Sequence, residues 1–289
     1  LSVRGLEKRL TFLKIRDIVT KQGDIDGLDT VNILAFVLAI RQEEILMSLD
    51  RSLDEETACR VSTLLKERSQ GKPLAYITGN KEFFSEPFFV DERVLIPRPD
   101  TETLVECALE ILNKKPDAER ILDMGSGSGA IGLIIAKKAG RRVACVDISL
   151  KALGVARKNS RDLGVPDRVD FLCSDLFGGI KTEKKFDMIV ANLPYVAPGE
   201  WDSLMRDVRV YEPRIALDGG AGGVEIYRRF IEEIPHYLKT DGYVLCEIGG
   251  DGRAEQVRDM LRVTGLSVVT KKDLSGNERV LIGSWTSLL

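Results

Sequence analysis

Asn192-Leu193-Pro194-Tyr195 places a side-chain amide, a rigid proline and an aromatic ring next to one another. The tetrapeptide follows the apolar run Phe186–Ala191, which predicts a short buried strand. Residues that follow a strand of an open α/β sheet lie at its carboxyl edge, where such sheets bind ligands. A carbonyl acceptor, a fixed turn and a flat apolar wall are suited to holding a planar group that carries a nitrogen. We therefore expect a ligand site at this tetrapeptide.

A second candidate site is the glycine-rich run from Asp123 to Gly129, which reads Asp-Met-Gly-Ser-Gly-Ser-Gly. It predicts a strand that ends in a tight turn, with a helix N-terminus facing the cleft. Asp147 ends the next predicted strand, and a carboxylate there accepts hydrogen bonds from ribose hydroxyls. The pattern fits a nicotinamide dinucleotide as well as other nucleotide cofactors, and Asp147 could also simply cap the helix after Ser149. The expected cofactor contacts in the turn are Gly125, Ser126, Gly127, Ser128 and Gly129.

Composition limits the functions that the chain can have. The net charge is −3, which gives no general attraction to phosphate backbones, so direct nucleic-acid binding is not expected. His236 is the only histidine, which makes a histidine-built metal site improbable, and we expect no metal. The five cysteines show no paired spacing. We interpret them as reduced, with the three in strand-like runs, Cys145, Cys173 and Cys246, in the core.

The chain shows no sign of a membrane segment. No apolar run reaches the length that spans a bilayer, and the first residues lack the charged-then-apolar order of a signal peptide. We expect a cytoplasmic protein with no membrane contact.

The sequence predicts two domains joined by a linker. Residues 1–72 carry helical periodicity, with a helix beginning near Leu6, a second around residues 31–39 and a third capped by Asp54. Basic and acidic residues are equal in number there, so the segment does not resemble a nucleic-acid-binding arm. We expect a small helical domain that recognises a substrate. Residues 73–95 predict a β-hairpin linker that includes Tyr76–Gly79, with its turn at residues 85–87. Residues 96–289 form the larger domain, which begins with a helix capped by Asp100 or Thr101.

Strands and helices alternate from Glu119 onward, which predicts a doubly wound α/β sheet of seven strands. The last two strands are joined by residues 273–277, too short a connection for a crossover helix, so we expect them to pair antiparallel. Such a sheet resembles that of the class I methyltransferases, a Rossmann-like family. That resemblance implies S-adenosylmethionine as the cofactor, with Asp175 and Leu176 near its adenine.

The wider set of motifs resembles the release factor glutamine methyltransferases over essentially the whole chain. The segments that carry the resemblance are Pro97–Glu102, the glycine-rich turn, Asn192–Tyr195, Tyr211-Glu212-Pro213, Ala216-Leu217, Gly219-Gly220, Glu247-Ile248-Gly249, Asp273-Leu274 and Glu278-Arg279-Val280. This family methylates the side-chain amide nitrogen of the glutamine in the Gly-Gly-Gln loop of class I peptide-chain release factors, which supports translation termination. We therefore expect a release factor as the protein substrate, and a monomer.

The resemblance also implies roles at the tetrapeptide. The Asn192 oxygen and the carbonyl of Leu193 accept the two amide hydrogens, Tyr195 packs against the glutamine, and Pro194 fixes the turn. Asn192, Pro194 and Tyr195 are thus the expected catalytic residues, and Asn192 also borders the cofactor.

Leu193 departs from the family, which usually has proline at this position. Asn-Leu-Pro-Tyr is also the form found in ribosomal RNA adenine dimethyltransferases, so adenine N6-methylation of RNA or DNA is the alternative. A cofactor-binding scaffold without catalysis is a further one. The adenine enzymes need a basic surface, which this acidic composition does not supply. We therefore favour the glutamine amide as the substrate.

Overall fold

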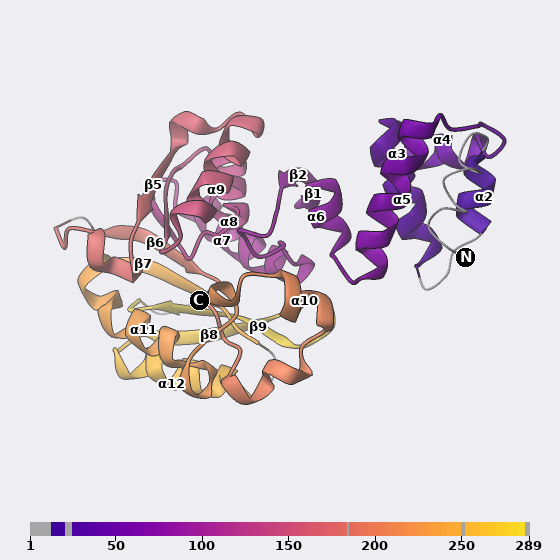
Figure 1. The fold of residues 1–289 in the computed structure, drawn as a ribbon. Coiled ribbons are helices and arrows are strands. Elements are labelled where there is room, and N and C mark those ends of the chain that lie inside the picture. The colour runs from indigo at the N-terminus through magenta and orange to yellow at the C-terminus, as the bar shows by residue number, and fades with distance from the viewer. Residues whose placement is uncertain (1–12, 21–24, 184, 250–251, 287–289) are drawn as a thin grey trace. The chain divides into compact units, whose positions relative to one another are not determined.

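The computed structural model describes residues 13–20, 25–183, 185–249 and 252–286. The chain divides into two compact units (Figure 1). The first comprises the chain up to Gly79 together with Arg206–Tyr211, and the second comprises Asn80–Met205 and the chain from Glu212 onward. Within the described ranges, no helix is both long enough and apolar enough to cross a membrane.

The first unit is built from helices. They are α2 (Ile15–Thr20), α3 (Gly27–Leu38), α4 (Gln42–Met47), α5 (Glu55–Ser69), α6 (Leu74–Thr78) and α10 (Arg206–Tyr211). Their core gathers small and aliphatic side chains such as Ile15, Leu34 and Ile45. Asp54 caps α5 as predicted, because its carboxylate accepts a hydrogen bond from the Thr57 amide at 2.7 Å. The start of the helix expected near Leu6 lies outside the described residues.

The hairpin was predicted only in part. Tyr76–Gly79 was expected as strand, but it lies in α6 and its C-cap, and the hairpin consists of β1 (Asn80–Phe83) and β2 (Glu86–Phe89). Four residues are too few for periodicity to separate helix from strand, and Gly79 ends the helix in the left-handed conformation. The turn lies at Phe84-Ser85, both with positive φ, rather than at residues 85–87.

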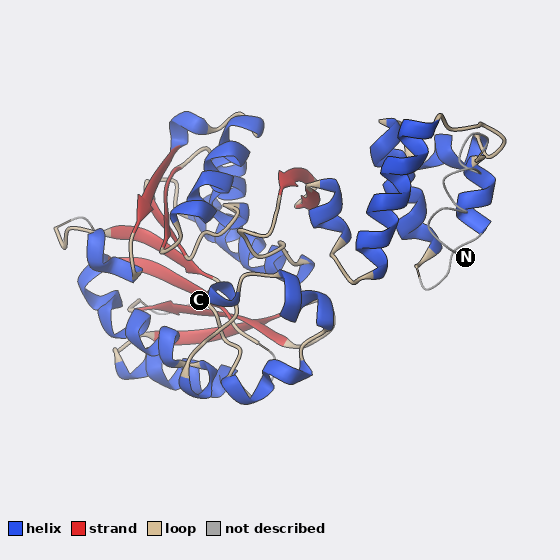
Figure 2. Ribbon diagram, viewed as in Figure 1, coloured by secondary structure: helices blue, strands red, loops and turns tan. Residues whose placement is uncertain are grey.

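The second unit contains the predicted seven-stranded sheet (Figure 2). In chain order the strands are β3 (Arg120–Met124), β4 (Arg142–Asp147), β5 (Val169–Cys173), β6 (Phe186–Ala191), β7 (Leu238–Glu247), β8 (Ser267–Lys272) and β9 (Glu278–Ser284). Their order across the sheet is β5-β4-β3-β6-β7-β9-β8. β9 pairs antiparallel with both β7 and β8, which confirms the expected antiparallel last strand. The strands from β5 to β7 pair in parallel.

Helices cover both faces of this sheet. α7 (Glu102–Lys114) and α8 (Ala130–Ala139) pack on one face, with α9 (Leu150–Asp162) beside them. α11 (Glu225–Tyr237) and α12 (Arg253–Val263) pack on the other face. The 3-10 turns between these elements are Pro99–Thr101, Pro166–Arg168, Leu176–Gly179, Pro198–Ser203, Arg214–Ala216 and Ala221–Gly223.

One part of the cysteine prediction is wrong. All five thiols are free, and Cys145 and Cys246 are buried as expected, but Cys173 is exposed. Cys173 is the last residue of β5, and β5 is the edge strand of the sheet. A strand-like apolar run therefore identified the strand without identifying its place at the edge.

Asn159 ties the hairpin to the glycine-rich turn within the second unit. Its side-chain amide donates to the carbonyls of Phe89 (3.0 Å) and Ser128 (2.9 Å), and its oxygen accepts from the Phe89 amide (2.8 Å). Asn159 is fully buried, so substitution by leucine leaves these three backbone groups without partners.

We predict that Asn159→Leu lowers the free energy of unfolding of the second unit by about 3 kcal/mol, at roughly 1 kcal/mol or more for each buried group left unpaired. Both tryptophans, Trp201 and Trp285, lie in this unit, so their fluorescence during urea unfolding measures it. Asn113→Leu, on the exposed side of α7, is the matched control. Equal losses in the two variants would contradict the prediction.

Candidate functional site

A cavity of about 530 Å³ opens at the carboxyl ends of β3, β4, β5 and β6, all within the second unit. This volume is in the range of small-molecule and cofactor sites, and the position is the one at which open α/β sheets bind ligands. Of the predicted site residues, those that line the cavity are Gly125, Gly127, Asp147, Asp175, Leu176, Asn192, Leu193 and Pro194. Ser126, Ser128, Gly129 and Tyr195 are not among its lining residues.

The glycine-rich turn is held against β4. The amides of Gly125 and Ser126 both donate to the carbonyl of Val146, at 2.8 and 3.0 Å. Gly125 has φ +75°, and a Cβ there would meet the Leu193 side chain at 3.0 Å. Glycine is therefore required by conformation, and it also lets the turn approach the Asn192–Tyr195 segment closely.

The two serines of the turn are buried, and one of them hydrogen-bonds to the backbone. The Ser126 hydroxyl donates to the carbonyl of Asp123 at 2.9 Å, and both serines are buried. Gly129 takes φ +83° at the start of α8, where a Cβ would lie 2.9 Å from Leu133. The expected contact of Ser126, Ser128 and Gly129 with a cofactor stays a prediction.

Asp147 connects the turn to the helix that follows. One carboxylate oxygen accepts from the Gly127 amide and the other from the Ser149 amide, each at 2.8 Å. Ser149 is itself the N-cap of α9. Burial raises the pKa of Asp147, while these backbone hydrogen bonds oppose the shift. Asp147 therefore supports the backbone of the turn and also lines the cavity.

Asp175 and Leu176 form the wall at the end of β5. Asp175 is half exposed and pairs with Arg229 of α11 at 2.7 Å, and both residues line the cavity. Leu176 is buried with φ +45°, a conformation that costs a non-glycine residue about 1–3 kcal/mol. Sequence reasoning did not find Arg229, because one basic residue on a helix face gives no signal.

Asn192-Leu193-Pro194-Tyr195 leaves the carboxyl end of β6 and is fixed at several points. The Asn192 side-chain nitrogen donates to the Thr101 hydroxyl at 3.2 Å, and the Leu193 amide donates to the Tyr227 hydroxyl at 3.2 Å. Leu193 is 3% exposed. The carbonyl of Tyr195 accepts from Arg253 at 2.7 Å. Side chain and backbone of the tetrapeptide are thus both held.

Two glycines lie against the backbone of Tyr195. A Cβ at Gly219 would lie 2.7 Å from the Tyr195 Cα, and one at Gly223 would lie 2.4 Å from the Tyr195 carbonyl oxygen. Val196 forms a bridge with Asp218, which brings the two ends of the long segment after β6 together. Within this segment the Trp201 ring lies 4.9 Å from the Arg214 guanidinium, so Trp201 makes a packing contact.

The predicted capping by Asp100 or Thr101 is wrong. α7 has no side-chain capping hydrogen bond, because the Thr101 hydroxyl is buried beside Asn192 and Asp100 pairs with Arg279 at 3.0 Å. Arg98, between its two prolines, pairs with the buried carboxylate of Glu212. The Pro97–Glu102 segment therefore supports the site rather than the helix end.

Two buried carboxylates were not among the predicted site residues. Asp123 is fully buried in β3, and Glu247 is 2% exposed at the end of β7. Burial raises the pKa of each to about 7. One oxygen of each, Oδ1 of Asp123 and Oε2 of Glu247, has no hydrogen-bond partner among the described residues. Both residues stand in segments that the sequence had singled out, but nothing marked either as buried.

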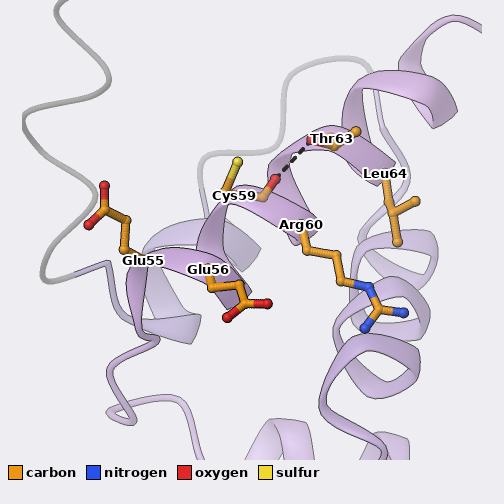
Figure 3. Close-up of a pocket in the computed structure, with 6 residues that line it drawn as sticks. All are labelled: Glu55, Glu56, Cys59, Arg60, Thr63 and Leu64. Atoms are coloured by element: carbon orange, nitrogen blue, oxygen red, sulfur yellow. Dashed lines mark hydrogen bonds between the residues drawn. The ribbon is translucent and has the colours of Figure 1, made fainter.

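The first unit carries a larger hollow, of about 700 Å³, that does not resemble a site (Figure 3). All six residues around it, from Glu55 to Leu64, come from α5, so one helix face forms it. Arg60 points toward α3 and lies 5.6 Å from the Phe36 ring, and the Thr63 hydroxyl bonds to the carbonyl of Cys59. No cluster of histidine, cysteine or carboxylate side chains in the described part of the chain could hold a metal ion.

Comparison with known proteins identifies the family. A methyltransferase small domain matches residues 100–208, and a PrmC N-terminal domain matches residues 19–79. The release factor glutamine methyltransferase of Rhodopirellula baltica is 37% identical over 277 residues, covering 92% of each chain. That of Koribacter versatilis is 39% identical, over 81% of this chain and 82% of the relative. This chain belongs to the release factor glutamine methyltransferases.

Solved structures agree on the fold of this family member. The hMettl16 catalytic domain superposes with a TM-score of 0.56 at 15% identity, over 80% of this chain and 82% of that one. A ribosomal protein L11 methylase from Lactobacillus delbrueckii superposes with a TM-score of 0.51 at 20% identity, over 71% of this chain and 89% of that one. At these identities the likeness establishes the class I methyltransferase fold and nothing about the substrate.

The cavity fits the cofactor of this family, S-adenosylmethionine, and the nicotinamide alternative loses its support. The cofactor carries a sulfonium and an ammonium group, and a cation is suited to a site that contains buried carboxylates. Asp147 is such a carboxylate in the cavity wall, and the fully buried Asp123, which does not line the cavity, lies close enough to Asp147 for its pKa to be raised further. Gly125, Gly127, Asp147 and Asp175 are the residues that would hold the cofactor.

We predict that Asp123 makes the cofactor-free protein less stable as the pH rises. Its folded-state pKa of about 7 lies above the ordinary value of 3.8, so its favourable contribution is complete below about pH 4 and is lost by about pH 7. One such group accounts for at most about 1.4 kcal/mol per pH unit. Asp123→Asn should therefore lose less stability than the wild type between pH 5 and pH 8.

Urea unfolding followed by tryptophan fluorescence at several pH values measures this difference. Asp117→Asn, at an exposed position, is the control and should follow the wild type. If Asp123→Asn shows the same pH dependence as the wild type, the buried carboxyl is not the cause.

Proposed function

We propose that this chain transfers the methyl group of S-adenosylmethionine to the side-chain amide nitrogen of a glutamine in the Gly-Gly-Gln loop of a class I release factor. The observation that carries the proposal is the amide of Asn192, held beside the cofactor-sized cavity by Thr101. Relatives of the same family, similar over nearly the whole chain, are named release factor glutamine methyltransferases.

The chemistry requires positioning more than acid–base catalysis. An amide nitrogen is a poor nucleophile because its lone pair is delocalised into the carbonyl. S-adenosylmethionine supplies an electrophilic methyl group on a positively charged sulfur. The Asn192 oxygen and the Leu193 carbonyl accept the two amide hydrogens, which fixes the nitrogen and directs its remaining electron density toward the methyl group. As the new C–N bond forms and the C–S bond breaks, one of these hydrogens leaves as a proton.

Tyr195 and Pro194 complete the proposed substrate site. Pro194 lines the cavity and fixes the turn, while the Tyr195 backbone is held by Arg253. The Tyr195 ring packs against the aliphatic part of the glutamine in this proposal. Leu193 contributes only its backbone carbonyl, because its side chain is buried against Gly125.

Adenine methylation is not favoured. The Asn-Leu-Pro-Tyr form is shared with adenine enzymes, but the relatives that cover most of the chain carry the release factor name. The net charge of −3 also gives no general attraction to nucleic acid. We infer no direct nucleic-acid contact.

The rest of the proposal concerns organisation. Residues 1–72 form the substrate-recognition domain, residues 73–95 the linker and residues 96–289 the catalytic domain. The helical segment matches a domain family of its own over residues 19–79, which supports a separate role for it. We propose a cytoplasmic location, because the proposed substrate acts in translation. We also propose that the protein is a monomer.

The proposal predicts which residue of the substrate receives the methyl group. With S-adenosylmethionine labelled in its methyl group, a class I release factor should acquire about one label per molecule. The same factor with its loop glutamine replaced by alanine should acquire none. Equal labelling of both proteins would refute glutamine specificity, and label in RNA or DNA would favour the adenine alternative.

The second prediction separates catalysis from cofactor binding. Asn192→Ala removes an acceptor for the amide hydrogens, so kcat should fall by about 10²- to 10³-fold, the effect typical of losing one positioned hydrogen-bonding group. The Kd for S-adenosylmethionine, measured by calorimetry, should change by less than about tenfold, because other residues line most of the cavity. Glu110→Ala, on the exposed side of α7, is the control. Undiminished kcat in Asn192→Ala would remove this residue from the mechanism.

A further inference from the structure

The site requires one particular orientation of the Asn192 side chain. An asparagine amide can rotate by half a turn, which exchanges its oxygen with its NH2 group. Only one of the two orientations presents an acceptor to the hydrogens of a substrate amide, and the other presents donors to donors. Some group in the protein must therefore favour the orientation that points the oxygen toward the substrate.

Sheet register places Glu247 beside Asn192. β6 and β7 pair in parallel with Ala191 opposite Cys246, so Asn192, which follows β6, comes next to Glu247, the last residue of β7. Thr101 lies against both of them, since hydrogen bonds from Thr101 and Asn192 lower the pKa of Glu247 against the effect of burial. Thr101 is 4% exposed and Glu247 is 2% exposed, so water does not compete for these contacts.

The hydrogen bonds in this cluster can run in only one direction when Glu247 is ionised. A carboxylate only accepts hydrogen bonds, and a threonine hydroxyl has a single hydrogen to donate. Thr101 therefore donates to Glu247 and must accept from Asn192, and the Nδ2 atom of Asn192 is the one that lies 3.2 Å from the Thr101 oxygen. The Oδ1 atom is left for the substrate.

The backbone of Glu247 anchors the peptide that precedes the second acceptor. Its carbonyl accepts a hydrogen bond from the Tyr227 hydroxyl, and that hydroxyl accepts one from the Leu193 amide at 3.2 Å. Tyr227 is 1% exposed, and Leu193 N–H donates to it on the same peptide plane as the Asn192 carbonyl. The peptide that leads to the Leu193 carbonyl is thus tied to the same residue of β7.

We propose that Glu247 is a positioning residue that orients both acceptors for the substrate amide, the Asn192 oxygen through its carboxylate and Thr101, and the Leu193 backbone through its carbonyl and Tyr227. The identity of the substrate rests on the proposed function, but the orientation of Asn192 does not. Glu247 itself touches neither substrate nor cofactor in this proposal.

The charge of Glu247 decides whether the arrangement holds. The charged groups that act on it are Arg279, which favours its ionised form, and Asp100, which opposes it, and these two are themselves paired at 3.0 Å. Once protonated, Glu247 can donate to Thr101, and the direction of the hydrogen bonds is no longer imposed. Since its pKa is about 7, the orientation should be fixed above neutral pH and become mixed below it.

The first test reads the Asn192 amide directly, in the full-length enzyme without substrate. Nitrogen-15 labelling of asparagine, with Asn192→Asp to assign the signal, isolates its NH2 resonances. In the wild type they should exchange slowly with solvent and shift with a midpoint near pH 7. In Glu247→Gln this titration should vanish, because a glutamine amide both donates and accepts and imposes no direction.

The second test measures kinetics. Glu247→Gln should lower kcat by about 10- to 100-fold, the effect expected from a misplaced reacting group, and leave the KM for S-adenosylmethionine nearly unchanged. The fall in kcat below pH 7 should be absent in this variant. Thr101→Val should cause a smaller loss of kcat than Glu247→Gln, because the hydrogen bond from Asn192 to Glu247 remains, and Thr101→Ser, which keeps the hydroxyl, should restore most of that loss. Tyr227→Phe should lower kcat without affecting the Asn192 resonances.

Asp187→Asn is the matched control, because Asp187 is a buried carboxylate at the other end of β6. It should keep the wild-type kcat and resonances. An unchanged Asn192 titration in Glu247→Gln, or equal kcat in Glu247→Gln and Asp187→Asn, would overturn the proposal. If no release factor is methylated but the Asn192 signals respond as stated, the proposed function fails and the role of Glu247 stands.

Discussion

The parallel pairing of β6 with β3 on one side and β7 on the other is the constraint on which the site depends. Ala191 lies opposite Met124 and opposite Cys246, so three chain segments leave the sheet together at one edge. The glycine turn follows β3, the Asn192 segment follows β6, and Glu247 ends β7. A slip of one residue in either pairing would turn Asn192 to the other face. Because β6 is buried on both faces, its apolar residues do not fix the register, and Asp187, which accepts hydrogen bonds from the amides of Glu119 and Arg120, is the polar residue that does.

Two buried carboxylates at this edge of the sheet lower the stability of the folded protein. Asp123 and Glu247 are buried with an unpartnered oxygen each, and an unpaired buried carboxylate is unfavourable. The two play different parts. Asp123 accepts a hydrogen bond from the Gly132 amide in α8, whereas Glu247 accepts hydrogen bonds from Thr101 and Asn192. Neither carboxylate reaches solvent, so each acts through its immediate neighbours alone.

Most of the sheet could be predicted because buried parallel strands are continuous apolar runs bounded by turn residues, as Phe186–Ala191 illustrates. The errors have local causes. Tyr76–Gly79 was too short for periodicity to decide, and Cys173 looked like any other strand residue although β5 is an edge strand. Thr101 had the right residue type and position for a helix cap. Only the three-dimensional pairing of β6 with β7 gives it another partner, and that pairing is not visible as a local pattern.

Leu193 and a proline at the same position would restrain the backbone by different physical means. Proline, which the family usually has there, restricts the backbone through its ring but has no N–H group. Leucine keeps the N–H, and in this chain that group donates to Tyr227, whose hydroxyl is bound in turn to the Glu247 carbonyl. Pro194 still restricts Leu193 to extended conformations. A buried hydrogen bond on the peptide before Leu193 thus restrains the backbone where a proline ring would do so, and the proposed role of the residue 193 carbonyl toward the substrate amide is compatible with this replacement.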